Sequence, residues 1–225
     1  MVTVCCVVDF DTDFDTDSEG DTTMKIAVYG ATGMIGSRVV AEALARGHEV
    51  TGITRTGGEL PEGVRAAQGN AGDAEFAKRV AADADVVVSA IGPSRTGGDR
   101  REFLADLRTL AETLGSARLL VVGGAGSLLV NGHRLVDDPA FPEVYKAEAL
   151  IAAEALEYVR GLGDTADWTF FSPAPVIQPG ERTGSYRTGT DSPAGDQISA
   201  EDFAVAMLDE IEKPAFQRRR FTAAN

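Results

Sequence analysis

Residues 25–36 constrain the fold of this chain more than any other segment. A short apolar run, 26–29, is followed by three glycines spaced G-x-x-G-x-x-G (Gly30, Gly33 and Gly36) and by a stretch, 37–46, with apolar residues at helical spacing. Glycine lets the backbone turn tightly and approach a pyrophosphate, and a helix N-terminus offers free N–H groups to phosphate oxygens. Strand, glycine turn and helix together predict a dinucleotide-binding site. The alternative is a glycine-rich turn that only packs the helix on the strand.

The end of the following strand, 49–54, bears on the choice of dinucleotide. An NAD-selective site usually carries Asp or Glu here to hold the ribose 2′-hydroxyl. This chain has Arg55 instead, and a guanidinium attracts a 2′-phosphate. The sequence therefore favours NADP over NAD, unless Arg55 is simply a solvated loop residue. Arg38 is either a second phosphate contact or a surface residue.

The remaining chain alternates strands and helices, which predicts an α/β, Rossmann-type fold: a doubly wound parallel sheet with helices on both faces. The predicted strands are 26–29, 49–54, 64–68, 85–92, 118–124, 168–173 and 219–222. The predicted helices are 37–46, 73–82, 100–114, 142–160 and 200–211. We interpret residues 24–225 as a single NAD(P)-binding domain whose C-terminal third adds a substrate-side lobe.

Ligands of such sheets bind beyond the carboxyl ends of the strands, and this rule selects the candidate cofactor-binding residues. They are Gly30, Thr32, Gly33, Met34, Ile35, Arg55, Asn70, Ala71, Ser89, Ala90, Ile91, Gly92 and Pro173. Among them, Asn70 is suited to an adenine edge and Ser89 to a ribose or the backbone. Ser127, after the strand 118–124, is the candidate catalytic residue for orienting an acceptor; a turn or helix-cap serine is the alternative.

The charge is uneven, and this limits the classes of partner. The net charge is −14, and residues 1–23 hold seven acidic and no basic residues. This low-complexity segment is predicted to be a disordered, acidic extension, and its acids lack the spacing of a calcium loop. An acidic chain argues against nucleic acid or an anionic membrane and favours a small-molecule substrate. A monomer and a homodimer are both compatible with these observations.

Cysteine and histidine usage predicts a cytoplasmic protein without a metal site. Cys5 and Cys6 are adjacent, so no disulfide framework exists, and no apolar run approaches the roughly 20 residues of a membrane span. His48 and His133 are the only histidines and are far apart. Neither metal-ligand spacing nor the G-x-S-x-G of a serine hydrolase is present.

From residue 24 onward the chain resembles the atypical short-chain dehydrogenase/reductases grouped with NmrA-like, NAD(P)H-binding proteins, and most of all the branch named for NADH-flavin reductases. The segments that carry the resemblance are 30–36, 87–93, 122–128, 167–174, 179–184 and 198–204. The resemblance implies a Rossmann fold, NAD(P)H binding and reduction of a small planar or carbonyl acceptor, with flavin the leading candidate.

One departure keeps other functions open. Ordinary members use Tyr-x-x-x-Lys, in which the lysine assists proton transfer by the tyrosine. Here Lys146 follows Tyr145 directly, and Ala149 occupies the position one helical turn on. Tyr145 is therefore either a catalytic acid in an unusual setting or an ordinary tyrosine. An NADP-binding sensor without turnover, and an epimerase or isomerase using bound NADP, are the alternatives to a reductase.

Overall fold

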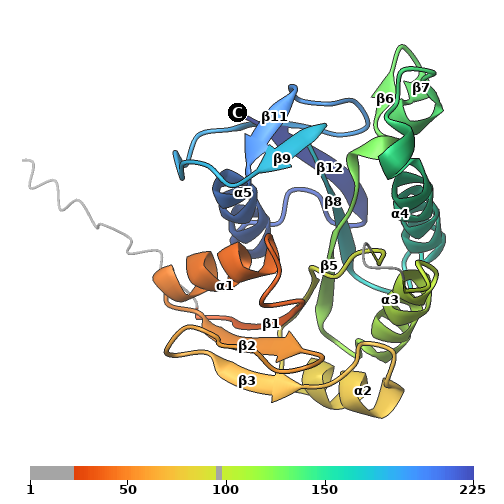
Figure 1. The fold of residues 1–225 in the computed structure, drawn as a ribbon. Helices are drawn as coiled ribbons and strands as arrows, with labels where there is room; N and C mark the ends of the chain where they lie inside the picture. Colours follow the sequence, from red (N-terminus) through yellow and green to blue (C-terminus); the bar gives the residue numbers. More distant parts are fainter. Residues whose placement is uncertain (1–22, 95–97) are drawn as a thin grey trace, which may run out of the picture.

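The chain, seen here as a computed structural model that describes residues 23–94 and 98–225, is organised around one eight-stranded sheet (Figure 1). The strand order is β10-β12-β8-β5-β4-β1-β2-β3. These strands are β1 (Lys25–Tyr29), β2 (Glu49–Thr54), β3 (Arg65–Gln68), β4 (Val86–Ser89), β5 (Arg118–Val122), β8 (Trp168–Pro173), β10 (Arg187–Gly189) and β12 (Arg219–Ala224). The predicted acidic extension lies outside the described residues, except for Thr23.

The sheet confirms the predicted fold class. Every neighbouring pair is parallel except β10 and β12 at one edge. β1 lies between β2 and β4, with Val28 opposite Gly52 on one side and Val88 on the other. The strand order therefore runs from β1 to β2 and β3 on one side and to β4 and β5 on the other, so it reverses beside β1. In such folds, dinucleotides bind at the point where the strand order reverses.

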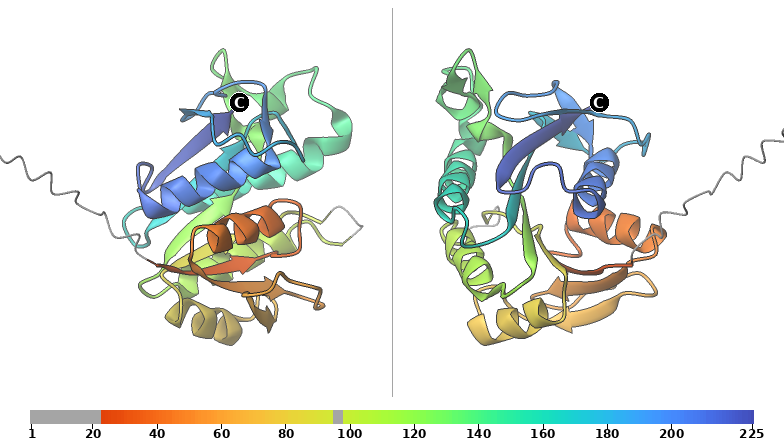
Figure 2. Two further views of the ribbon diagram at one scale, coloured as in Figure 1. Left: turned by 90° about the vertical axis from the view of Figure 1, so that its left-hand side faces the viewer. Right: turned by 180° about the vertical axis from the view of Figure 1, so that it is seen from behind.

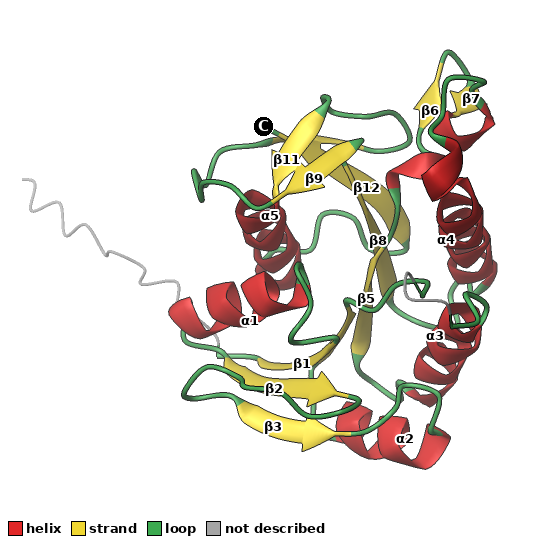
Figure 3. Cartoon of the chain, in the orientation of Figure 1, coloured by secondary structure: helices red, strands yellow, loops and turns green. Residues whose placement is uncertain are grey.

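Helices cover both faces of the sheet, as the alternating pattern predicted (Figures 2 and 3). α1 (Gly36–Ala45) and α5 (Ala200–Glu212) pack on one face, and α2 (Ala74–Ala82), α3 (Glu102–Thr113) and α4 (Glu143–Gly161) on the other. Two buried apolar clusters result, one between each helix layer and the sheet. The predicted N-cap of α2 is present: the Asp73 carboxylate accepts a hydrogen bond from the Phe76 N–H at 3.0 Å.

The predicted pattern missed five short strands. They are β6 (Leu129–Val130) and β7 (His133–Arg134), which form a hairpin; β9 (Val176–Gln178) and β11 (Gln197–Ser199), which form a small parallel sheet; and the edge strand β10. Each has two or three residues, too few to show an alternating pattern. The antiparallel edge formed by β10 is the one departure from a wholly parallel main sheet.

A buried carboxylate fixes the segment that carries β9–β11 to α5. Asp202 is fully buried and accepts hydrogen bonds from the N–H groups of Thr183 (2.9 Å) and Gly184 (2.8 Å) and from the Asn225 side chain (2.7 Å). Burial acts to raise the pKa of Asp202, but these hydrogen bonds outweigh it and hold the pKa below its usual range. The last residue of the chain and the 183–184 turn are therefore anchored at one point.

Residues 23–94 and 98–225 meet the requirements of neither a membrane-spanning helix nor a metal site. None of their helices combines the length and the apolar composition that crossing a bilayer requires. They also contain no group of three side chains placed to hold a metal ion.

Candidate dinucleotide-binding site

A crevice of about 320 Å³ opens at the carboxyl ends of β1, β2, β3 and β4, where the switch in strand order places it. Nine of the predicted cofactor-binding residues line it: Gly30, Thr32, Gly33, Arg55, Asn70, Ala71, Ala90, Ile91 and Gly92. These residues come from four different strand ends, and the parallel sheet brings them to one place. Four predicted residues, Met34, Ile35, Ser89 and Pro173, do not line the crevice.

The glycine turn after β1 is pressed against the end of β4. Gly30 has φ +78°, and a Cβ there would lie 2.8 Å from the carbonyl oxygen of Ala90. A Cβ on Gly36 would overlap the carbonyl oxygen of Gly30. A side chain at either position would therefore push the turn away from the sheet, and its absence leaves a cradle in which a ligand can touch the backbone.

This cradle has the donors that a pyrophosphate requires. The Ile35 N-cap position of α1 makes no side-chain capping hydrogen bond. The N–H groups of Thr32, Met34 and Ile35 have no backbone acceptor in the described part of the chain, whereas the N–H of Ser37 already bonds Gly33 at 2.9 Å. Unsatisfied N–H groups and the positive end of the helix dipole favour an anion here, so the residues present fit a dinucleotide phosphate.

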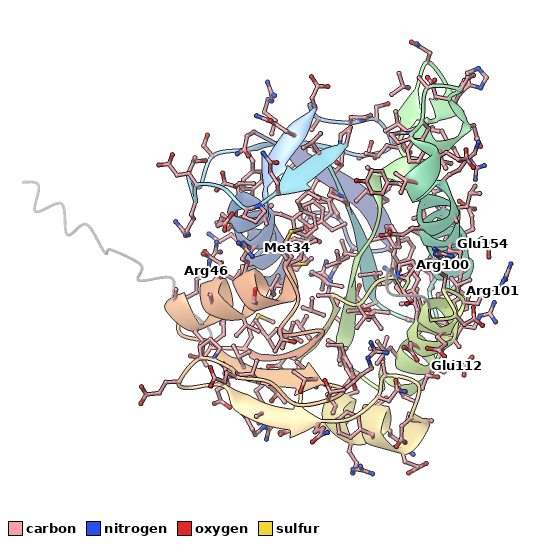
Figure 4. All side chains as sticks on the ribbon, viewed as in Figure 1. Met34, Arg46, Arg100, Arg101, Glu112 and Glu154 are labelled. Atoms are coloured by element: carbon pink, nitrogen blue, oxygen red, sulfur yellow. The ribbon has the colours of Figure 1, made fainter. Side chains whose placement is uncertain are left out.

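Met34 and Ile35 therefore offer only their backbone N–H groups to a ligand. Met34 is 40% exposed and lies at the end of α1 (Figure 4). Arg38, the second candidate phosphate contact, instead bonds Glu201 of α5 at 2.5 Å and the Met34 carbonyl at 2.7 Å. These contacts favour the alternative, structural interpretation of Arg38.

The end of the crevice beyond β2 and β3 is acidic, with Arg55 as its single basic side chain among the described lining residues. The acids are Asp99, Glu102 and Asp106. Burial raises the pKa of the Asp106 carboxyl, Arg55 lowers it in part, and Glu102 raises it further. Arg55 and Asp106 thus both line the crevice and lie close enough to interact electrostatically.

The sequence analysis missed the contribution of α3 to this crevice. Glu102, Phe103 and Asp106 line it, and the acids are four residues apart on one side of the helix. The spacing was visible in the sequence, but which side of α3 faces the strand ends depends on its packing against α2 and α4.

Some polar side chains at the crevice are hydrogen-bonded within the protein, whereas others have no partner among the described residues. Asn70 accepts a hydrogen bond from the Gly72 N–H at 3.1 Å, which fixes the loop after β3. Tyr29 lines the crevice, but its hydroxyl is buried, as is the hydroxyl of Ser89; neither hydroxyl has a hydrogen-bond partner among the described residues. Burial and the Asp73 carboxylate raise the pKa of Tyr29, so its hydroxyl stays protonated and can donate.

The two candidate catalytic residues lie elsewhere, on adjacent elements. Ser127 ends the 3-10 turn η1 (Ala125–Ser127) and is 6% exposed; its hydroxyl oxygen accepts a hydrogen bond from Arg220 Nη1 at 3.2 Å. Tyr145, in the first turn of α4, is 59% exposed. The expected lysine position is occupied by Ala149, whose Cβ packs against η1: a Cβ on Gly126 would lie 2.8 Å from it. Neither candidate lines the crevice, and both assignments stay predictions.

A doubly wound sheet with a glycine-rich anion cradle at its switch point defines a nicotinamide-dinucleotide-binding protein of the Rossmann type. The chain belongs to the NAD(P)H-binding family, whose model matches residues 30–214. It is 39% identical over 217 residues to the uncharacterized protein YwnB of Bacillus subtilis (strain 168), covering 90% of this chain and 99% of that one.

Two solved structures share the fold over their whole length. One, from Burkholderia pseudomallei and described provisionally as an exported protein, is 44% identical with a TM-score of 0.80, covering 90% of this chain and 100% of its own. The other, SP1627 of Streptococcus pneumoniae TIGR4, carries the provisional name NADH-flavin reductase; it is 33% identical with a TM-score of 0.80, covering 90% and 99%. The family places this chain among proteins that bind a nicotinamide cofactor, NADH or NADPH.

Proposed function

We propose that this protein is an NADPH-dependent reductase of a small planar or carbonyl acceptor, with flavin the leading candidate. The observation that carries the proposal is the crevice at the carboxyl ends of β1–β4, which is lined both by the glycine turn that leads into the uncapped start of α1 and by Arg55. The start of α1 binds the pyrophosphate, and Arg55 binds the 2′-phosphate of the adenosine ribose.

The cofactor supplies the hydride, and the chain supplies binding and orientation. Ser127 is the proposed positioning group for the acceptor. Its oxygen already accepts a hydrogen bond from Arg220, so the hydroxyl hydrogen is free to donate to an acceptor oxygen. Solvent supplies the proton, since Tyr145 has no lysine one helical turn away.

Flavin is favoured because the S. pneumoniae relative, whose provisional name is NADH-flavin reductase, is 33% identical over nearly its whole length. The test is steady-state oxidation of NADPH and NADH by the purified protein with FMN, FAD and small quinones. We expect turnover with a lower KM for NADPH than for NADH. Turnover with equal KM values would refute the cofactor assignment, and turnover only with non-planar acceptors would refute the acceptor class.

A second function, an NADP sensor that binds without turnover, is favoured by one observation. The place of the conventional lysine is filled by Ala149, which packs on η1, so the tyrosine–lysine pair of ordinary relatives cannot form there. Calorimetric titration with NADPH separates the two functions. Tight binding together with no oxidation of NADPH across the acceptor panel would establish the sensor and exclude the reductase.

A further inference from the structure

A second hollow, of about 510 Å³, lies between the end of α4 and the start of β12, away from the carboxyl-end crevice. We call it the arginine hollow, because four arginines line it: Arg160, Arg218, Arg219 and Arg220. Two carboxylates, Asp164 and Asp191, line it as well, so the lining has an excess of two positive charges in a chain whose net charge is −14.

The exposed arginines are only partly neutralised. Arg160 bonds Glu157 and Asp191, each at 2.9 Å, and Arg218 lies 3.3 Å from Asp164, whose side chain is 94% exposed. Arg219 makes no ion pair with a carboxylate of the described residues. Exposed ion pairs of this kind contribute little stability, so an incoming anion can replace them at small cost.

The inner wall of the hollow carries two buried donors without acceptors. Arg220 is 4% exposed and bonds the Asp191 carboxylate and the Ser127 carbonyl, but its Nε–H has no partner in the described part of the chain. Trp168 is 3% exposed, and its indole N–H likewise has no acceptor there. Buried donors are rarely left unpaired, and two of the eight unpaired buried polar atoms of the described residues belong to side chains that line this hollow.

Arg218, the first of the three consecutive arginines, has an unfavourable backbone conformation. Arg218 has φ +52°, a left-handed conformation that is unfavourable for a residue other than glycine, and its N–H donates to the Trp168 carbonyl at 2.6 Å. A backbone outlier of this kind is a reason to look for a function of the segment. Here it directs the chain into three consecutive arginines at the rim of the hollow.

We propose that the arginine hollow binds a small phosphate-bearing anion, either free phosphate or pyrophosphate or a small phosphate ester. Guanidinium groups donate in pairs to phosphate oxygens, and an anion of this size can take donors from Arg218 and Arg219 at once. The proposal is independent of the reductase function, since the hollow shares no lining residue with the crevice. Arg220, on the inner side of the hollow, also donates to the carbonyl and the hydroxyl oxygen of Ser127.

Trp168 is the single tryptophan of the chain, so its fluorescence reports on this hollow alone. The experiment titrates the full-length protein with inorganic phosphate, pyrophosphate and glycerol 3-phosphate at constant ionic strength, with chloride as the reference anion. The test variant is Arg218→Ser with Arg219→Ser. The matched control is Arg101→Ser, an exposed arginine near Glu154 on the α3 side (Figure 4). Arg55→Asp serves as a second control, which removes anion binding in the crevice.

We expect a saturable change in Trp168 fluorescence for the wild type and for both controls. In the double variant the half-saturation concentration should rise about 100-fold, since each of the two lost charge-assisted contacts is typically worth roughly a factor of ten. The stronger response to free anions or to the ester identifies the source of the phosphate group. A response that follows ionic strength without saturating, an equal response in the double variant, or its loss in Arg55→Asp would each overturn the proposal. If the double variant unfolds by circular dichroism, Arg219→Ser alone, whose side chain pairs with no described carboxylate, decides the same question.

Discussion

Arg55→Asp tests the cofactor preference most directly. The substitution converts one arginine and three carboxylates at the adenosine end of the crevice into four carboxylates. Loss of a charge-assisted contact costs about 1.5–3 kcal/mol, and because Arg55 is exposed we expect the lower end of that range. Repulsion between the new carboxylate and a 2′-phosphate adds about 1 kcal/mol at a separation of roughly 4 Å in water. NADPH affinity should therefore fall roughly 30- to 150-fold, with NADH affinity changed much less.

The assay is fluorescence or calorimetric titration with both cofactors at two salt concentrations. Arg79→Asp, on α2 and away from the crevice lining, is the matched control for the change in total charge. The difference between NADPH and NADH should also narrow in the wild type as salt rises, since an exposed contact is screened. An unchanged NADPH affinity in Arg55→Asp, or an equal fall in the control, would refute the role of Arg55.

Four further predictions follow from the same geometry. Because burial raises the folded-state pKa of Asp106, the contribution of its protonated form to stability is present at low pH and is lost as pH rises through that pKa. Asp106→Asn should therefore raise Tm at pH 7 but not near pH 3. An equal change of Tm at both pH values would show that burial does not raise this pKa. Gly36→Ala should lower Tm and weaken NADPH binding together, since its Cβ overlaps the Gly30 carbonyl; a wild-type Tm would show that the turn yields. Tyr145→Phe should retain most activity, whereas Ser127→Ala should reduce it up to about 100-fold; the reverse pattern would restore a tyrosine acid. Deleting residues 1–23 should leave Tm and cofactor affinity nearly unchanged, and a large fall in Tm would show that this acidic segment is integral to the fold.

The main sheet and its helices could be predicted from the sequence because their signals are local. β4 and β5 contain short apolar runs, 86–88 and 119–122, that are fully buried, and α3 repeats its apolar residues at helical spacing. β10 could not be predicted, because three residues carry no period and their pairing with β12 depends on where the C-terminal strand lies. The predicted extension 1–23 falls almost wholly outside the described residues and stays a prediction.

The residues of the candidate site also fall into those that the sequence predicts and those that depend on tertiary packing. The rule that ligands bind at the carboxyl ends of strands found nine crevice residues, since it needs only the strand boundaries. It also selected Ser89, whose side chain is fully buried, because the rule does not say to which side a residue points. Asp106 was missed for the opposite reason: it lies on a helix, and its approach to Arg55 depends on how α3 packs.

The Arg220–Ser127 contact decides what a Ser127 substitution measures. Arg220 donates to the Ser127 carbonyl at 2.9 Å as well as to its hydroxyl at 3.2 Å, and it also bonds the Asp191 carboxylate. Ser127→Ala removes only the hydroxyl, so the backbone contact keeps η1 and Arg220 together and the buried guanidinium keeps its carboxylate. Unchanged stability together with lower activity would then assign the loss to the hydroxyl itself. Equal falls in stability and activity would instead make Ser127 a structural residue, held in place by an arginine 93 positions further along the chain.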